Sequence, residues 1–138
     1  MISIEQLVAN SREWIGTRFV HQGRTRIGCD CLGMVAADLA ELGSKILLNH
    51  LPINYGRNPQ ALLIDGLTDL CNPRALEPGV LVTFKFPDAQ FPSHAAIYTG
   101  ESIIHAFERV GKVVETRYED PWLRMAHSTW ALPLVMYR

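Results

Sequence analysis

The chain has 138 residues, of which 48% are hydrophobic and 20% are charged, with a formal net charge of −1. These values fit one globular domain over residues 1–138, which at this length buries enough surface to fold without disulfide bonds. The charge excludes a strongly basic nucleic-acid scaffold, and because no apolar run approaches about 18 residues the sequence contains no membrane span.

Residues 1–70 have the spacing typical of helices joined by loops. Ser3 and Gln6 form a capping box at the start of the first helix, and Gly43 is a stop signal at the end of the second. Pro59 suits the first turn of the third helix, because the backbone N–H that proline lacks would be unpaired there. The predicted helices cover residues 4–15, 31–43 and 59–70, and the segments 17–28 and 44–58 are predicted as loops.

From residue 78 onward, the pattern changes to the alternation typical of strands. The predicted strands cover residues 80–86, 94–99, 102–107, 112–116 and 130–137, with a short helix at 119–125. Pro133 interrupts the last strand, which we therefore expect at a sheet edge, because proline cannot donate to a strand ladder. Helices followed by strands indicate an α+β fold in which N-terminal helices pack on a small antiparallel sheet.

The two strands that flank Gly100 predict a tight hairpin with a definite register. Glycine suits the first central position of a two-residue type II′ turn. In that register Ile97 pairs with Ile104 on an apolar face, and His94 and His105 lie diagonally on the other face, within reach of each other. A shift of one residue would separate the histidines, but it would also disrupt the apolar face.

Cys31 is the strongest candidate for a catalytic residue. It lies at the predicted start of a helix, where unpaired backbone N–H groups and the helix dipole lower a thiol pKa and are able to hold an oxyanion. A nucleophilic cysteine needs a base, and His94, oriented by His105, completes the geometry of a cysteine–histidine triad. The alternative for each of the three residues is an ordinary buried structural role.

The cysteines also raise the question of a metal or a disulfide framework. Three cysteines are an odd number, with two only one residue apart, which indicates a reducing compartment and no disulfide framework. Cys29, Cys31, His94 and His105 could together bind zinc, but the Cys-x-Cys spacing matches zinc ligands poorly. We therefore expect no metal and no cofactor.

Four motifs, in this order, resemble those of the NlpC-type cysteine peptidases, a papain-like family that cuts bacterial cell-wall peptides. They are Gly16-Thr17-Arg18-Phe19, Asp30-Cys31-Leu32-Gly33, His94-Ala95-Ala96-Ile97-Tyr98 and Ile104-His105-Ala106. The resemblance implies a papain-like α+β fold with Cys31 as nucleophile, His94 as base and His105 as the third, polar member. The Gly-Cys-Asp-Cys-Leu-Gly form of the second motif looks most like the branch found in phage tail and gene-transfer-agent gene clusters.

The resemblance also implies where a substrate is bound. The loop before the nucleophile, with Arg18, Phe19 and Gln22, and the adjacent Asp30 are the expected substrate-binding residues. Phe19 stands where the family has a tyrosine, so one hydroxyl donor is absent, and Gln22 or the Cys31 amide would serve instead. The arginines of this loop form either a rim for the carboxylates of wall peptides or a solvated surface; they are Arg18, Arg24 and Arg26.

The function that follows from the resemblance is cleavage of an amide bond in peptidoglycan stem peptides, expected between γ-D-glutamate and diaminopimelate. The expected partners are peptidoglycan peptides and phage tail-tip proteins, with no nucleic acid. The N-terminus has no secretory signal, so we expect synthesis in the bacterial cytoplasm and a place in a virion tail or tail-like particle that acts at the cell wall. Two alternatives stay open: a tail-tip assembly or hub protein with little catalysis, and a thiol acyltransferase or amidase with another substrate.

Overall fold

Helices dominate the first half of the chain. The computed structural model describes residues 1–53, 55 and 60–138, so the predicted helix start at Pro59 lies outside the described residues. The helices are α1 (Ile4–Glu13), α2 (Cys31–Glu41), α3 (Ile46–His50), α4 (Gln60–Thr68) and α5 (Trp122–Met125). None of the helices in this described part has both the length and the apolar character needed to cross a membrane.

The first two helices begin at side-chain caps. The Ser3 hydroxyl accepts from the Gln6 N–H at 3.0 Å, and the Gln6 side chain accepts from the Ser3 N–H at 2.8 Å, which confirms the predicted capping box. At α2, the Asp30 carboxylate accepts from the Gly33 N–H at 2.7 Å. Such caps satisfy N–H groups that the first turn of a helix leaves unpaired, and the second one fixes the turn that carries Cys31.

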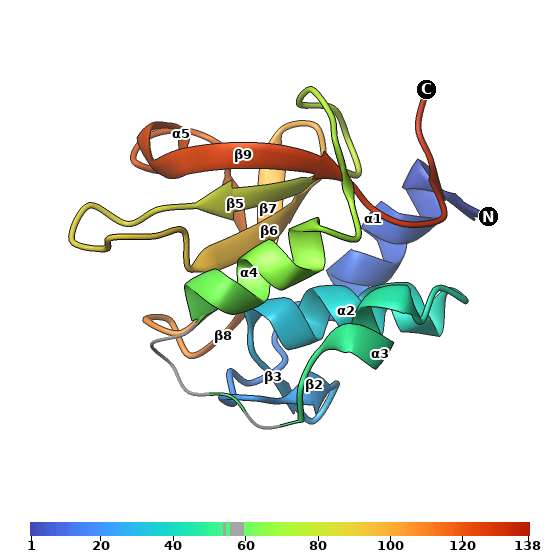
Figure 1. Ribbon diagram of the computed structural model, residues 1–138, viewed down its shortest axis with the longest axis horizontal. Helices are drawn as coiled ribbons and strands as arrows, with labels where there is room; N and C mark the ends of the chain where they lie inside the picture. The colour runs from blue at the N-terminus through green and yellow to red at the C-terminus, as the bar shows by residue number, and fades with distance from the viewer. Residues whose placement is uncertain (54, 56–59) are drawn as a thin grey trace.

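Most of the second half forms a six-stranded antiparallel sheet in the order β4-β9-β5-β6-β7-β8. Its strands are β4 (Asn72–Pro73), β5 (Leu81–Phe84), β6 (His94–Tyr98), β7 (Ser102–Phe107), β8 (Lys112–Arg117) and β9 (Ala126–Ala131). Two short pairs lie outside it: β1 (Ile2–Ser3) runs parallel to β10 (Val135–Met136), and β2 (Arg24–Thr25) forms a hairpin with β3 (Gly28–Cys29). Because β1 and β10 pair, the two ends of the chain lie side by side (Figure 1).

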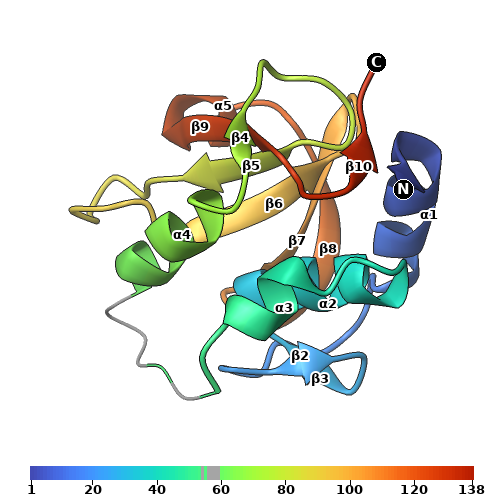
Figure 2. The same cartoon turned by 45° about the vertical axis from the view of Figure 1, so that its right-hand side comes forward.

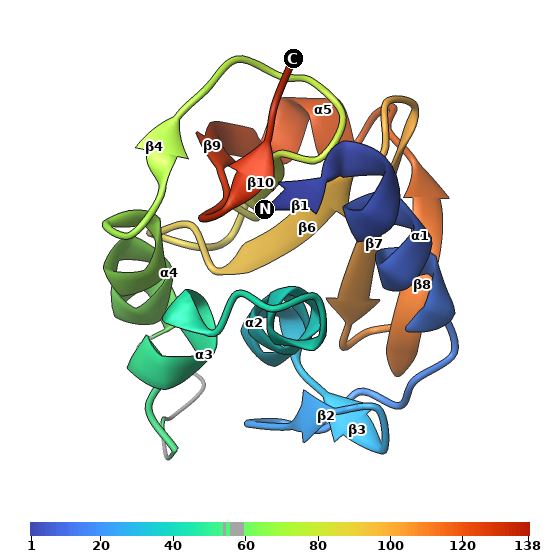
Figure 3. The same cartoon turned by 90° about the vertical axis from the view of Figure 1, so that its right-hand side faces the viewer.

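The sheet is covered by apolar side chains on both faces. On one face, α1 and α2 pack against alternate residues of the central strands, including Ala95, Ile97 and Ile104 (Figures 1 and 3). On the other face, Trp122 of α5 packs against the intervening residues, such as Phe84. The alternation of side chains along each strand explains why neighbouring residues join different clusters. The structure thus confirms an α+β fold with N-terminal helices on an antiparallel sheet, and the sheet is larger than expected.

The predicted hairpin register is confirmed. Ile97 pairs with Ile104, and the Thr99 N–H donates to the Ser102 carbonyl at 2.9 Å across the turn. Gly100 has a φ of +117°, which side-chain-bearing residues rarely adopt. The turn glycine therefore sets the register that places the two histidines of β6 and β7 on one face.

The C-terminal strand differs from its prediction. The segment predicted as one edge strand forms two, β9 and β10, separated at Pro133. β9 begins earlier, at Ala126, and lies between β4 and β5 within the sheet, because Pro133 falls after its last residue and leaves its ladder intact. The edge position next to it is taken by β4, which is only two residues long.

Short elements also lie in segments predicted as loops. Helix α3 occurs within residues 44–58, where the buried Leu47 anchors one turn to the core next to α2. The hairpin of β2 and β3 lies beside the start of α2 (Figures 2 and 3). Elements this short contain too few residues for a periodic pattern, so the sequence does not predict them. In the structure they pack against α2.

Candidate active site

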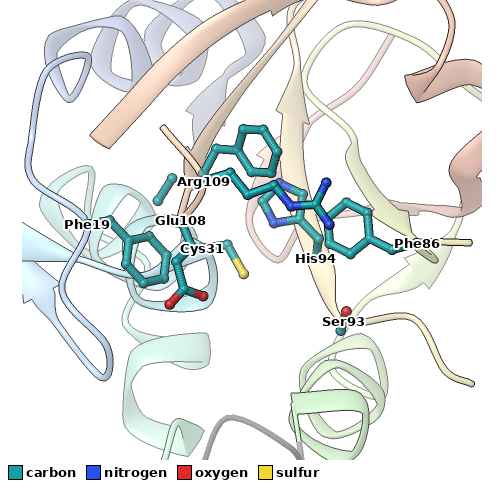
Figure 4. A pocket seen from close by; sticks show the side chains of 9 residues that line it. Phe19, Cys31, Phe86, Ser93, His94, Glu108 and Arg109 are labelled. Carbon is teal, nitrogen blue, oxygen red and sulfur yellow. The ribbon is translucent and has the colours of Figure 1, made fainter. Parts of the chain in front are cut away.

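Cys31 is the first residue of α2, and its side chain points into a pocket between the helical part and the sheet. Figure 4 shows the Cys31 sulfur between Phe19 on one side and His94 on the other. The pocket has a volume of about 310 Å³. Its lining residues come from the loop before α2, from α2 and from the strands β6 and β7 with the segments beside them: Phe19, Cys31, Phe86, Ser93, His94, Ala106, Phe107, Glu108 and Arg109.

Asp30 anchors the start of α2 to the preceding loop. Besides capping Gly33, its carboxylate accepts from the Gln22 N–H at 3.0 Å and from the Tyr55 hydroxyl. Asp30 is fully buried, and these donors satisfy the desolvated carboxylate. This set of hydrogen bonds holds the backbone of Cys31 in place from behind the pocket.

The two histidines are joined by a direct hydrogen bond. His94, the first residue of β6, shares a contact of 2.7 Å between its Nε2 and the Nδ1 of His105 on β7. The other ring nitrogen of His105, Nε2, lies 3.0 Å from the hydroxyl of Thr116 on β8. The three side chains therefore form a hydrogen-bonded series across neighbouring strands. This series involves both nitrogens of His105 and Nε2 of His94, but not Nδ1 of His94.

Aromatic rings enclose the histidine pair. Four rings have centroids between 5.7 and 5.9 Å from that of His94, and they belong to Phe84, Phe86, Phe107 and Trp122. Trp122 also lies edge-on to His105 at 4.8 Å. These rings pack around both imidazoles and bury them, although His94 still lines the pocket.

Burial favours the uncharged forms of both partners. It lowers the pKa of His94 well below its ordinary value and that of His105 to about 4. Burial, and secondly the charge of Asp30, raise the pKa of the Cys31 thiol to about 12. Backbone N–H groups, including that of Ala95, lower the thiol pKa by a smaller amount. The expected low thiol pKa is therefore wrong for this structure, because desolvation outweighs the helix start.

The structure brings the predicted triad together and distributes the other predicted site residues more widely. Cys31, His94 and Phe19 line the pocket, and His105 lies behind His94. Arg18 is exposed and bridges to β8 outside the residues that line the pocket. Gln22 donates from its side chain to the Tyr55 carbonyl and, like Asp30, supports the loop that precedes Cys31.

The other arginines of the loop before α2 have protein partners. Arg24 donates to the carbonyls of Leu51 and Pro52. Arg26 forms ion pairs with Glu13 at 3.2 Å and Glu41 at 2.9 Å. Within the described residues, the arginine that lines the pocket is Arg109, whose guanidinium lies 5.4 Å from the centre of the Phe86 ring.

Sequence reasoning missed several residues around the histidines. Phe86, Phe107 and Trp122 enclose them, and Thr116 contacts His105. Alternation along the strands would have found Phe107, since it lies two residues after His105 on the same face. No local pattern identifies Tyr55, which reaches Asp30 from a segment 25 residues away along the chain.

Within the part of the chain that the structure describes, no group of three or more histidine, cysteine or acidic side chains is arranged to hold a metal ion. Cys29 is a buried free thiol whose pKa burial raises to about 12. Cys71 is also buried and free, and its thiol donates to the Leu67 carbonyl. Cys29 and Cys71 are therefore side chains packed in the protein interior.

Comparisons with known proteins identify relatives of this chain in sequence and in fold. Residues 16–131 match the sequence model of the NlpC/P60 family. Over 87 residues the chain is 37% identical to tail tip assembly protein K of Escherichia phage lambda, and the match covers 59% of this chain and 42% of that protein. The chain thus spans less than half the length of that relative.

Solved structures show the same fold at low sequence identity. An NlpC/P60 family protein from Bacillus cereus ATCC 10987 superimposes with a TM-score of 0.69 and 17% identity, over 91% of this chain and 39% of that one. The NlpC/p60 domain of the peptidoglycan hydrolase SagA superimposes with a TM-score of 0.68 and 16% identity, over 94% of this chain and 98% of that one. The architecture is therefore shared well beyond the four short motifs.

Proposed function

We propose that this chain, which belongs to the NlpC/P60 family, is a cysteine hydrolase that cleaves an amide bond in peptidoglycan stem peptides. One feature supports this activity above all: Cys31, at the start of a helix, and His94, bonded to His105, line the same cavity. A thiol, a base and a group that orients the base are the parts that acyl transfer through a thioester requires.

In the first half of the reaction, the sulfur attacks the amide carbonyl. Since Nε2 of His94 is bonded to His105, Nδ1 takes the thiol proton as the sulfur–carbon bond forms. The negative oxygen of the tetrahedral intermediate is held by the backbone N–H of Cys31, where the helix start also places partial positive charge. The negative oxygen of the intermediate and the imidazolium of His94 therefore form together, as the carbonyl is attacked.

In the second half, the intermediate breaks down and the enzyme is regenerated. The imidazolium of His94 gives its proton to the leaving amine, and the carbon–nitrogen bond breaks to leave a thioester on Cys31. A water molecule, deprotonated by His94, then attacks the thioester. The products are a carboxylate and an amine, and the thiol recovers its proton.

The bond we propose joins γ-D-glutamate to diaminopimelate, and the site of action is the cell wall beneath a phage-like tail. The similarity to a tail tip assembly protein supports the tail location. The exposed Arg109 at the pocket offers a cation for the carboxylates of such peptides. The single domain over residues 1–138 then supplies the catalytic module, and peptidoglycan peptides are its substrate.

Purified sacculi that contain diaminopimelate test this activity. We expect the wild type to release peptides with a new amino terminus at diaminopimelate, detected by mass spectrometry, and Cys31→Ala and His94→Ala to release none. Circular dichroism verifies that each variant is folded. Equal release by wild type and Cys31→Ala would show that the thiol does not carry the reaction, and release of other fragments would assign another bond.

A second candidate is a tail-tip assembly protein that retains the fold without catalysis. Two observations favour it: the name of the phage relative and the presence of Phe19 where the family motif has a tyrosine. This candidate predicts that the folded wild type releases nothing from sacculi and co-purifies with tail-tip proteins, and that Cys31→Ala assembles equally well.

A further inference from the structure

We infer that Thr116 is a positioning residue that stabilises the productive tautomers of both active-site histidines by accepting a hydrogen bond from His105. The inference rests on the proposed function, in which His94 takes a proton from Cys31, and it assigns a role to a side chain outside the triad. Thr116 contacts neither the substrate pocket nor Cys31 among the described contacts, so it acts through His105.

The sheet register brings the Thr116 hydroxyl to His105. In the pairing of β7 with β8, Thr116 lies opposite Ile103, and His105 lies opposite Val114, so the threonine and His105 are diagonal neighbours on one face. Their contact, from Oγ1 to Nε2, is 3.0 Å, and His105 is fully buried. Diagonal neighbours on adjacent strands are within reach of long side chains, and the imidazole spans the gap.

The position of the hydrogen on each imidazole ring follows from the proposed transfer of a proton from Cys31 to His94. To take the thiol proton, Nδ1 of His94 must be unprotonated, so its Nε2 carries the hydrogen and donates to Nδ1 of His105. His105 then carries its own hydrogen on Nε2, where the oxygen of Thr116 accepts it. The opposite arrangement would place a hydrogen on Nδ1 of His94, and this tautomer cannot take the thiol proton.

Tautomer choice matters here because both rings are uncharged. Burial lowers the pKa of each, so each ring carries a single hydrogen that sits on one nitrogen or the other. Trp122 and the phenylalanine rings around the pair offer no oxygen or nitrogen acceptor to His105. In the productive tautomer the Thr116 hydroxyl is the acceptor for the Nε2 hydrogen of His105. The hydroxyl is also able to donate to an unprotonated Nε2, so its removal costs the productive tautomer its acceptor, whereas the opposite tautomer loses only a donor to a ring nitrogen.

Removing the hydroxyl while keeping the shape of the side chain gives the first test. We expect Thr116→Val to lower kcat on sacculi-derived peptides about 3- to 10-fold, the effect of one neutral hydrogen bond, and to leave KM nearly unchanged. Thr116→Ser, which keeps the hydroxyl, should recover most of this loss. Thr25→Val makes the same chemical change on an exposed strand and serves as the matched control.

Nitrogen-15 NMR of the histidine rings gives a second readout that does not depend on activity. In the wild type we expect hydrogen on Nε2 of both His94 and His105, and in Thr116→Val a population with hydrogen on Nδ1 of His105. Unchanged tautomers in a folded Thr116→Val protein, or a wild type with hydrogen on Nδ1 of His105, would overturn the role of Thr116. If the wild type shows the expected tautomers but cuts no peptide, the proposed activity fails while the positioning holds.

Discussion

Burial favours the uncharged forms of Cys31 and His94, because it raises the pKa of the thiol and lowers that of the imidazole. A buried thiolate–imidazolium pair is favourable only if its attraction exceeds the cost of removing two charges from water. In this pocket the Asp30 carboxylate adds a further cost for the thiolate. Proton transfer is therefore expected to accompany attack on the substrate and not to precede it.

In the proposed mechanism, His105 orients His94 and does not take the thiol proton itself. We expect His105→Ala to lower kcat by about 10- to 10⁴-fold with little change in KM, since the members of a triad act as a unit. His105→Asn keeps an oxygen that accepts from Nε2 of His94 and should recover part of the rate. Steady-state kinetics on isolated stem peptides, with circular dichroism to verify folding, measures both effects.

Two outcomes would contradict the orienting role of His105. Near-normal turnover in His105→Ala would mean that His94 holds its orientation through the surrounding rings alone. An unfolded His105→Ala protein would instead assign His105 a structural role, which its complete burial among aromatic side chains also permits.

At the scale of elements, the start of α2 depends on a close approach between the helix and the loop before it. A Cβ atom on Gly33 would lie 1.9 Å from the carbonyl oxygen of Gly23. That same carbonyl accepts from the N–H of Asp30, the residue before Cys31, at 3.1 Å. A side chain at Gly33 must therefore displace the backbone that holds Cys31.

Gly33→Ala and Gly66→Ala make the same change in two helices with opposite expected results. We expect Gly33→Ala to destabilise the protein by about 1–3 kcal/mol, because the added methyl group has no space. A Cβ atom on Gly66, in α4, would meet no other atom within 4 Å, so Gly66→Ala should stabilise the helix by up to about 1 kcal/mol. Urea unfolding measures both, and equal stability of the two variants would contradict the close approach.

The sequence predicted best those elements in which local pattern and packing agree. The hairpin register followed from an apolar face and a turn glycine, so the sequence alone was enough to place His94 and His105 as a diagonal pair. It was not enough to find the partner of His105, because Thr116 lies on a strand whose register depends on the whole sheet. The prediction of a low thiol pKa was wrong for a similar reason. The position of Cys31 at the start of a helix is a local feature, whereas its desolvation depends on how the helices pack against the sheet.

At the scale of the whole molecule, the site forms only when the two halves of the chain pack together. Cys31 comes from the helical part and belongs to the cluster that joins α1, α2 and one face of the sheet. Both histidines come from strands of the sheet and lie beside Trp122, which packs on the other face. The same packing buries ionisable groups, so the stability of the fold depends on pH through groups that serve or support the site.

The buried histidines and the buried carboxyl group of Asp38 change the free energy of unfolding in opposite directions as the pH falls. Burial lowers the pKa of His105 from 6.5 to about 4 and lowers that of His94 as well, so the unfolded chain binds more protons below pH 6.5. Their contribution to stability is complete above pH 6.5 and is lost as the pH falls toward 4. Asp38, which accepts from Ser11 and Asn10, has a pKa raised by burial from 3.8 to about 6, so its contribution is lost as the pH rises from 4 through 6.

We expect the histidines to dominate, so that the free energy of unfolding is lower at pH 5 than at pH 7. His105 alone accounts for a loss of roughly 2 kcal/mol over this interval, and Asp38 offsets roughly 1 kcal/mol of it. His105→Asn should therefore reduce the difference between the two pH values, and Asp38→Asn should enlarge it. Urea unfolding at both pH values measures these differences, and a wild type that is equally stable at pH 5 and pH 7 would mean that protons reach the histidine pair without unfolding.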